Sequence, residues 1–335
     1  MSLKWNTALK KRSLLTLFDI TDLEMLDLIN LAIDLKARRR SGVRGSLLHR
    51  RQIALIFEKS STRTRCATSV AVRDEGGSTE YLSRNDIHIG SKESVADTAR
   101  VLGRMFDGIL FRGYSQRVVE DLAKYSGVPV WNGLTDEFHP TQILADLMTI
   151  QENFGRLRGL TLAYVGDGRN NMANSLMIGC AKAGVNFVNC TPSELMPDPD
   201  LVEQTRAIAT RNDSTITIVH DPVTGVRGAN VLYTDVWVSM GEEAHKANRL
   251  ALLKPFQVNA HLVEATGNNG GDLIFLHCLP AFHDHQTNVT QESGALEVSD
   301  EVFEAAYSKV FDQAENRMHT IKALIVSALA DPETV

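Results

Sequence analysis

The chain has 335 residues, of which 43% are hydrophobic and 23% are charged, with a formal net charge of −6. This length exceeds one ordinary core and predicts two domains of about 150 residues each. The negative net charge gives no general attraction to nucleic acid or to an anionic membrane surface, so any affinity for phosphate must be local.

Membrane insertion and secretion are not expected from the sequence. No stretch approaches the roughly 18 apolar residues of a membrane span, and residues 1–7 lack the apolar core of a signal peptide. The four cysteines, Cys66, Cys180, Cys190 and Cys278, are too few and too scattered for a disulfide framework. These features favour a reducing, cytoplasmic location.

The first long helix is predicted by a capping box that runs from Thr21 to Glu24. The helical pattern continues to about Arg40, and Gly42 follows as a plausible C-cap. The basic run at residues 36–40 falls in the last turn, where cations suit the helix dipole. We interpret this run as a solvated helix end and not as a nucleic-acid site.

Short apolar runs alternate with helical patterns along the rest of the chain. Most of these runs are continuous, which is typical of parallel strands with helices on both faces. They lie at residues 52–57, 79–82, 107–111, 128–131, 160–165, 185–190, 215–219, 230–235 and 272–276. The alternation predicts an α/β protein with two doubly wound parallel-sheet domains.

Two helices are expected to join these domains. One runs from about residue 139 to 154, and the last, at about 314–330, has an apolar face that we expect to pack on the first domain. The predicted first domain therefore comprises residues 1–150 with a returning helix at 318–335, and the second comprises residues 151–317.

Polar clusters follow many of these strands. Ligand-binding groups gather at the carboxyl ends of parallel strands, so these clusters are candidate site residues. They are Ser61–Thr64, Arg112, His139–Gln142, Gly166–Asn171, Asp235–Gly241 and His277–Pro280.

The cluster after the first strand has the character of an anion site. It carries Ser61, Thr62, Arg63 and Thr64 at an expected helix start. Unpaired N–H groups, the helix dipole, hydroxyls and a guanidinium all suit a phosphate. An ordinary N-cap explains one serine or threonine, but four such side chains in succession favour the anion site.

The next two clusters are ambiguous when each residue is taken alone. Arg112 after a buried strand could form a salt bridge, and His139 before Pro140 fits an ordinary helix start. Gln142 lies three residues after His139 and so on the same helix face. This pair suits the polarisation of a carbonyl group better than the binding of a metal.

A nicotinamide cofactor is weakly supported. Gly166 and Gly168 form half of a dinucleotide fingerprint, but Asn171 stands at the place of the third glycine. The following strand also ends in Asn189 and Cys190 instead of an acidic residue. We therefore expect no nicotinamide cofactor.

The most metal-like cluster contains His277, Cys278, His283 and His285. Zinc sites usually have tighter ligand pairs and a second pair elsewhere in the chain. We therefore interpret Cys278 as a thiol that lines a site and expect no metal.

Taken together, these motifs resemble those of the aspartate/ornithine carbamoyltransferase family. The matches to its carbamoyl phosphate motifs are Ser61–Thr64, Phe111–Gly113, His139–Gln142 and His277–Pro280, with Arg317 in a Glu-Asn-Arg context. Asp235–Gly241 and Asn170–Asn171 resemble its ornithine-binding motifs; the aspartate-specific members lack the first block. The resemblance covers essentially the whole chain in the expected order.

The resemblance implies transfer of the carbamoyl group of carbamoyl phosphate to the side-chain amine of L-ornithine, giving L-citrulline and phosphate. It implies no cofactor or metal, a role in either direction of arginine metabolism, and a homotrimer or multiple of trimers with shared active sites. Three alternatives stay open: aspartate or another amine as the acceptor, a nicotinamide-dependent dehydrogenase, and a catalytically silent paralogue.

The resemblance also implies a role for each matching residue. Phosphate would be held by Ser61, Thr62, Arg63, Thr64 and Arg112. Donors to the carbonyl oxygen would be Thr64, Arg112, His139 and Gln142. The carbamoyl phosphate site would be completed by Pro140, Thr141, Cys278, Leu279 and Arg317. Ornithine would be bound by Asn171, Asp235, Ser239 and Met240.

One residue departs from the family pattern. His88 stands in a polar loop where many members carry glutamine. The resemblance implies that this side chain reaches the active site of a neighbouring subunit, where a protonated imidazole would bind phosphate more strongly.

Overall fold

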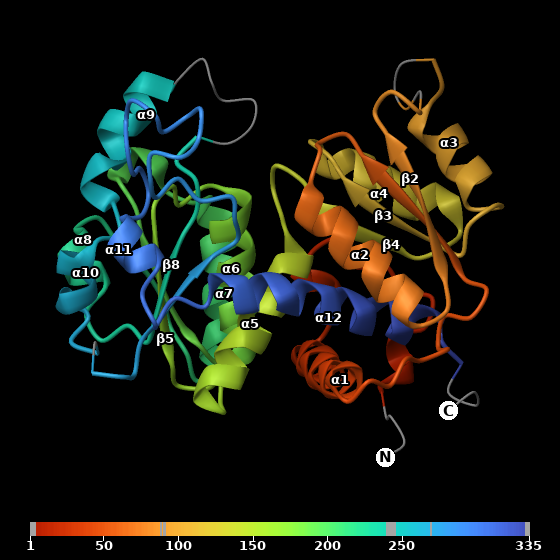
Figure 1. Cartoon of the computed structure of the whole chain (residues 1–335), viewed down its shortest axis with the longest axis horizontal. Coiled ribbons are helices and arrows are strands. Elements are labelled where there is room, and N and C mark those ends of the chain that lie inside the picture. The colour runs from red at the N-terminus through yellow and green to blue at the C-terminus, as the bar shows by residue number, and fades with distance from the viewer. Residues whose placement is uncertain (1–4, 88, 90–91, 239–245, 269, 332–335) are drawn as a thin grey trace. The chain divides into compact units, whose positions relative to one another are not determined.

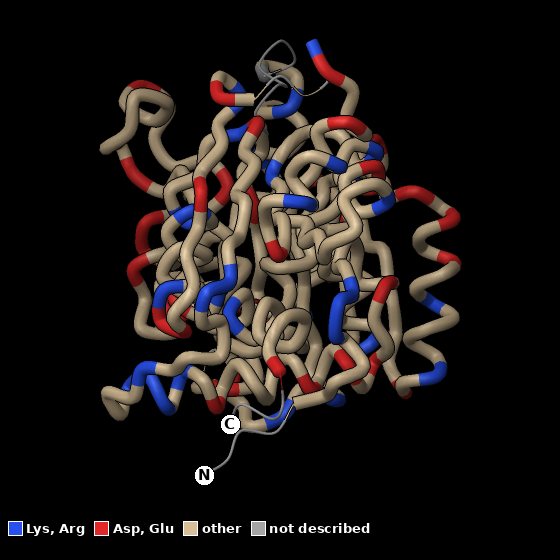
Figure 2. Tube along the Cα trace, turned by 90° about the vertical axis from the view of Figure 1, so that its right-hand side faces the viewer, with Lys and Arg blue, Asp and Glu red and all other residues tan. Residues whose placement is uncertain are grey.

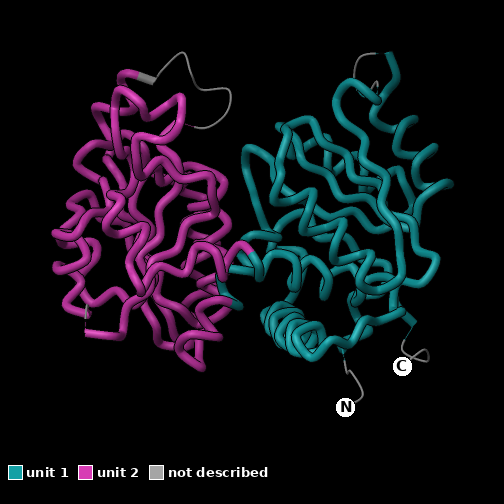
Figure 3. The backbone as a smooth tube through the Cα atoms, viewed as in Figure 1, with its two compact units in different colours: residues 1–148, 315–335 teal, residues 149–314 magenta. Residues whose placement is uncertain are grey.

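The computed structural model describes residues 5–87, 89, 92–238, 246–268 and 270–331. The chain separates into two compact units, residues 1–148 with 315–335 and residues 149–314 (Figure 3). Both units are built on an all-parallel sheet, which confirms the predicted fold class. Within the described ranges, no helix combines the length and apolarity that crossing a membrane requires.

The first unit has a four-stranded sheet with the order β2-β1-β3-β4 (Figure 1). Its strands are β1 (Gln52–Phe57), β2 (Ser78–Ser83), β3 (Gly108–Arg112) and β4 (Val130–Leu134). The central strands β1 and β3 are buried along nearly their whole length, as their continuous apolar sequences predict. The order changes direction between β1 and β3, which is where a doubly wound sheet opens a crevice for ligands.

Among the described residues, six α-helices belong wholly or partly to this unit. They are α1 (Asp22–Arg40), α2 (Thr62–Asp74), α3 (Val95–Leu102), α4 (Gln116–Ser126), α5 (Pro140–Phe154) and α12 (Val310–Leu329). The division between the units falls within α5 and within α12. The chain therefore passes between the units through two helices.

The capping box at the start of α1 is present, since Thr21 and Glu24 each accept from the other's backbone N–H. The interpretation of the basic run as a wholly solvated helix end is wrong at Lys36. This side chain is buried and its Nζ donates to Asn316 Oδ1 on α12 at 2.8 Å. Lys36 faces α12 because it lies on the apolar face of α1, which the helical period places inward.

The last helix returns to the first unit, as predicted. Figure 1 shows α12 (blue) beside α1 and α2. Lys322 Nζ on α12 donates to Asp74 Oδ2 on α2 at 2.9 Å, and Arg317 reaches the start of α2. This packing brings a residue from near the end of the sequence to the carboxyl ends of β1 and β3.

The second unit has a five-stranded sheet with the order β7-β6-β5-β8-β9. Its strands are β5 (Thr161–Val165), β6 (Asn186–Cys190), β7 (Ile216–Val219), β8 (Val231–Thr234) and β9 (Ile274–His277). Its other helices are α6 (Asn171–Ala183), α7 (Pro199–Arg211), α8 (Pro222–Gly225), α9 (Lys246–Leu253), α10 (Ala260–Ala265) and α11 (Asp300–Phe303). The change of direction lies between β5 and β8, so this unit also has a ligand crevice at the ends of two neighbouring strands.

Candidate active site

In the first unit, the candidate site begins where β1 leads into α2. Ser61 caps the helix, and its Oγ accepts from the backbone N–H of Thr64 at 3.2 Å. Thr62 is exposed, Arg63 is half-buried and Thr64 is fully buried. The four predicted phosphate residues thus share the first turn of one helix, whose N-terminus carries positive partial charge.

Two buried arginines converge on the Thr64 hydroxyl. Arg317 Nη2 donates to Thr64 Oγ1 at 2.7 Å, and Arg112 Nη1 donates to the same oxygen at 3.5 Å. Arg112 and Arg317 are 8% and 3% exposed, so both cations lie inside the unit. Since the Thr64 oxygen accepts from both arginines, its own proton is available to donate to a ligand.

His139 lies among these cations. It is 3% exposed, and its Nδ1 is 3.4 Å from Thr141 Oγ1. Burial, followed by the charges of Arg317, Arg112 and Arg63, holds the pKa of His139 well below its usual value. The imidazole is therefore neutral at neutral pH and can donate one hydrogen bond without carrying a charge.

The turn before His139 is held by a buried polar cluster. Thr135 Oγ1 donates to Gln116 Oε1 at 2.8 Å and accepts from the backbone N–H of Phe138 at 3.1 Å. Asn132 Nδ2 donates to the carbonyl oxygen of Leu15 at 2.9 Å. These contacts fix the path by which β4 delivers His139 to the start of α5.

Gln142 follows on the first turn of α5 and is fully buried. Its Nε2 donates to Asp146 Oδ1 at 2.8 Å. One of the two hydrogens on the nitrogen that we expected to donate to a substrate carbonyl is therefore engaged by Asp146. The oxygen Oε1 has no hydrogen-bond partner among the described residues, so Gln142 also offers an acceptor, which we did not predict.

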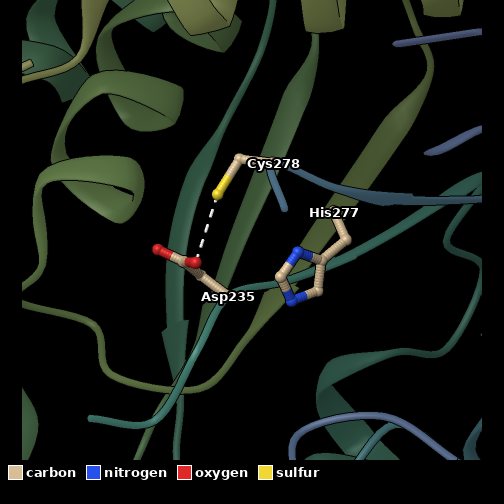
Figure 4. A group of neighbouring side chains, drawn as sticks. All are labelled: Asp235, His277 and Cys278. Carbon is tan, nitrogen blue, oxygen red and sulfur yellow. Dashed lines mark hydrogen bonds between the residues drawn. The ribbon is translucent and has the colours of Figure 1, made fainter. Parts of the chain in front are cut away.

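In the second unit, Asp235 and Cys278 meet at the ends of β8 and β9 (Figure 4). Cys278 Sγ donates to Asp235 Oδ1 at 3.1 Å, and Asn170 Nδ2 is 3.5 Å from Asp235 Oδ2. Asp235 is 8% exposed, and burial raises its pKa despite the opposing influence of His277 and Cys278. A buried carboxyl group of this kind favours a cationic ligand.

His277 and Glu297 support the turn that carries Cys278. His277 Nδ1 accepts from the backbone N–H of Leu279 at 2.9 Å, so its hydrogen is on Nε2, which faces Glu297 Oε1 at 3.2 Å. Leu279 has a φ of 60°, a backbone conformation that residues other than glycine rarely adopt. Asp235, His277 and Cys278 lie close enough to share a metal ion, but Nδ1 of His277 is occupied by Leu279.

The half-fingerprint after β5 is packed against side chains of other segments of the second unit. The Gly168 N–H donates to Thr191 Oγ1 at 3.0 Å, and a Cβ at Gly168 would lie 2.8 Å from Asn189 Oδ1. Asp167 forms a buried ion pair with Arg249 of α9 at 2.5 Å. The turn thus serves to start α6, where Asn170 is the N-cap and Asn171 the first helical residue.

Of the histidines that we grouped with Cys278, His283 and His285 lie outside the group formed by Asp235, His277 and Cys278. His283 Nδ1 is 2.7 Å from Asp300 Oδ1, and its ring stacks on Phe303 with 3.7 Å between centroids. His285 lies against Gly294. Three other predicted site residues, His88, Ser239 and Met240, lie outside the described residues.

Asp146 and Glu297 were not predicted from the sequence. Asp146 lies four residues after Gln142 on the same helix, and this helical spacing could have identified it. Glu297 is 20 residues from His277 and is joined to it only by the fold. Lys and Arg are otherwise interspersed with Asp and Glu along the chain (Figure 2).

Fold and candidate sites together define a two-unit α/β protein with buried arginines at the strand ends of one unit and a buried carboxyl group at those of the other. Residues 12–152 match the family model described as the aspartate/ornithine carbamoyltransferase carbamoyl-P binding domain. Residues 158–328 match the model of the Asp/Orn binding domain of the same family. The chain belongs to the aspartate/ornithine carbamoyltransferase family.

Similar proteins carry the more specific name. The chain is 55% identical over 329 residues to a catabolic ornithine carbamoyltransferase of Bacillus licheniformis, covering 96% of this chain and 98% of that one. It is 54% identical to the catabolic enzyme of Enterococcus faecalis, with coverages of 97% and 98%. The ornithine carbamoyltransferase structure from Pyrococcus furiosus matches with a TM-score of 0.89 at 42% identity, covering 96% of this chain and 98% of that one.

Proposed function

We propose that this chain transfers the carbamoyl group of carbamoyl phosphate to the side-chain amine of L-ornithine, giving L-citrulline and phosphate. The observation that carries the proposal is the convergence of Arg112 and Arg317 on Thr64 beside a neutral His139. The names of the similar proteins support ornithine as the acceptor.

The phosphate group would bind at the start of α2. Ser61, Thr62, Arg63 and Thr64 would donate to its oxygens, and Arg112 would add a second guanidinium. These cations would stabilise the dianion as it leaves. Binding would also offset the cost of keeping positive charges inside the unit.

The reaction then needs little beyond positioning and electrostatics. The neutral amine nitrogen attacks the carbonyl carbon and forms a C–N bond. The carbonyl oxygen gains negative charge, which Thr64, Arg112 and neutral His139 would stabilise. The C–O bond to phosphate then breaks, and the nitrogen loses a proton. Arg317, Pro140, Thr141, Cys278 and Leu279 would line the site around the reacting group.

The amino-acid end of ornithine would be held by the second unit. The buried carboxyl group of Asp235 would accept from the α-ammonium group, and Asn171, Ser239 and Met240 would complete the site. Because only the uncharged side-chain amine attacks, the site must favour its deprotonated form.

We further propose a homotrimer or multiple of trimers, with His88 reaching the active site of a neighbouring subunit. The support is the family resemblance. The four free cysteines fit the proposed cytoplasmic location.

The test is a citrulline assay with a panel of acceptors: L-ornithine, L-aspartate, putrescine and N-acetylornithine. Turnover is expected with L-ornithine alone, and the reverse reaction is followed as ornithine release from citrulline and phosphate. Preference for aspartate or putrescine would overturn the assignment of the acceptor. Absence of transfer to every amine would overturn the proposed activity.

A further inference from the structure

The pair formed by Gln142 and Asp146 is not explained by phosphate binding. Both side chains are fully buried on successive turns of α5, and Gln142 Nε2 donates to Asp146 Oδ1 at 2.8 Å. Gln142 also belongs to the same helical turn as His139, since its backbone N–H donates to the His139 carbonyl oxygen at 3.1 Å. A buried carboxyl group therefore lies behind a residue of the candidate site.

This pair determines which end of the Gln142 amide is free. An amide has one donor end and one acceptor end, and a rotation of 180° exchanges them with little change of shape. When Gln142 Nε2 faces the Asp146 carboxylate, Gln142 Oε1 points away from Asp146 and can accept a hydrogen bond from a ligand. The reversed amide would place two oxygen acceptors against each other, which is unfavourable in a buried site.

We propose that Asp146 is a positioning residue that makes the site selective for a ligand with an N–H donor next to its carbonyl. The inference rests on the proposed function, because a carbamoyl group has such a donor in its –NH2. An acetyl group of nearly the same size has a methyl group there. Acetyl phosphate would leave Gln142 Oε1 buried without a partner, and sites built to pair a polar group discriminate strongly against such analogues.

The first test is Asp146→Asn, which keeps the volume but can accept or donate. The asparagine amide can donate to Gln142 Oε1 and so turn the Gln142 nitrogen toward the ligand. We expect kcat/KM for carbamoyl phosphate to fall by about 30-fold or more, whereas the inhibition constant of acetyl phosphate changes by less than about threefold. Thr149→Val, a buried change one turn further along α5, is the matched control. It should leave both kcat/KM for carbamoyl phosphate and the inhibition constant of acetyl phosphate unchanged.

The second test exchanges the two groups. The double variant Gln142→Glu with Asp146→Asn again presents an oxygen to the ligand, because the new asparagine donates to one carboxylate oxygen and leaves the other free. It conserves volume and charge, and we expect it to recover at least about a third of the lost selectivity for carbamoyl over acetyl phosphate on a logarithmic scale.

A purely structural role for Asp146 would lower the affinity for both phosphates together, and the double variant would not restore their ratio. That result overturns the inference. If Asp146→Asn does not fold, the double variant decides alone, and if neither folds, Asp146 acts on stability and the inference is overturned. Failure of the proposed function is separate, because wild-type protein would then form no citrulline.

Discussion

The two units place sites of opposite charge at equivalent positions of the same kind of sheet. In the first unit, Arg112 and Arg317 surround a threonine at the change of strand order between β1 and β3. In the second, a carboxyl group and a thiol meet beside the change of order between β5 and β8. Topology thus fixes where a ligand can bind, and the side chains at the strand ends decide which ligand it is.

The two sites also differ in the direction in which the pKa of a buried group is shifted. Burial, and then the charges of three arginines, lower the pKa of His139, whereas burial raises the pKa of Asp235 against the opposing influence of His277 and Cys278. The proposed ligand of each site carries the charge opposite to that of the site. An anion would bind beside the arginines of the first unit, and an ammonium group beside Asp235 of the second. Variants that remove one charge should damage the binding of one substrate and spare the other.

The largest effect is expected from Arg63→Ala. Loss of a charge-assisted contact to the departing phosphate should lower turnover by about 10²–10³-fold, because that contact strengthens as negative charge develops. Arg73→Ala, an exposed change on the last turn of the same helix, is the control and should retain near-normal activity. Unchanged citrulline formation by Arg63→Ala would contradict the proposal that Arg63 binds the phosphate group.

Asp235→Asn should act on the other substrate. We expect about a 10- to 100-fold loss of ornithine affinity, because a neutral amide cannot balance an ammonium group in a buried site. Phosphate binding, measured by calorimetry, should change little. Asp272→Asn, at an exposed position before β9, serves as the control. Equal losses for both substrates would contradict the separation of charge between the two units.

Cys278→Ser should have a smaller effect. A serine hydroxyl can still donate to Asp235, so we expect about a tenfold loss in kcat/KM for ornithine, from altered distance and polarisability at the site. Metal content should not change. Stoichiometric zinc in wild-type protein purified without chelators, and its absence from the variant, would mean that the thiol is a metal ligand.

The sequence predicted the sheets better than the surroundings of the sites. Each of the nine apolar runs contains or overlaps a strand, because a strand with two covered faces needs a continuous apolar sequence. The capping box of α1 was predictable from a local signal, and the return of α12 from its apolar face together with the family resemblance. Lys36 was misjudged because its burial depends on Asn316, 280 residues away.

The residues of the candidate sites could be named from the sequence, but not all of their orientations. Gln142 shows this limit, since the orientation of its amide depends on a hydrogen bond from Nε2 to Asp146. His283 was grouped with Cys278 because the two are close in sequence, but its ring stacks on Phe303 and faces Asp300. Such choices depend on partners brought together by folding, which spacing along the chain does not encode.

The smallest predicted effect concerns a second neutral histidine of the first unit. Burial lowers the pKa of His319 on α12 to about 4, and its Nε2 faces Glu315 Oε1 at 3.1 Å. Unlike His139, this residue has no proposed contact with substrate. A variant at His319 therefore measures what burial of a neutral imidazole does to stability, without any effect on substrate binding.

The sign of its contribution to stability follows from the difference between the folded and unfolded states. Below the unfolded value of 6.5, the unfolded chain binds a proton at His319 that the folded chain does not bind until the pH approaches about 4. The free energy of unfolding therefore falls as the pH decreases from about 6.5 to about 4. His319→Gln cannot titrate, so its free energy of unfolding should fall by about 2 kcal/mol less than that of wild type between pH 7.5 and pH 5 in urea unfolding. Staying at pH 5 or above avoids the titration of Glu315, whose pKa is lowered by the His319 hydrogen bond in spite of burial. Parallel losses in the two proteins would show that His319 accepts its proton in the folded state as readily as in the unfolded one.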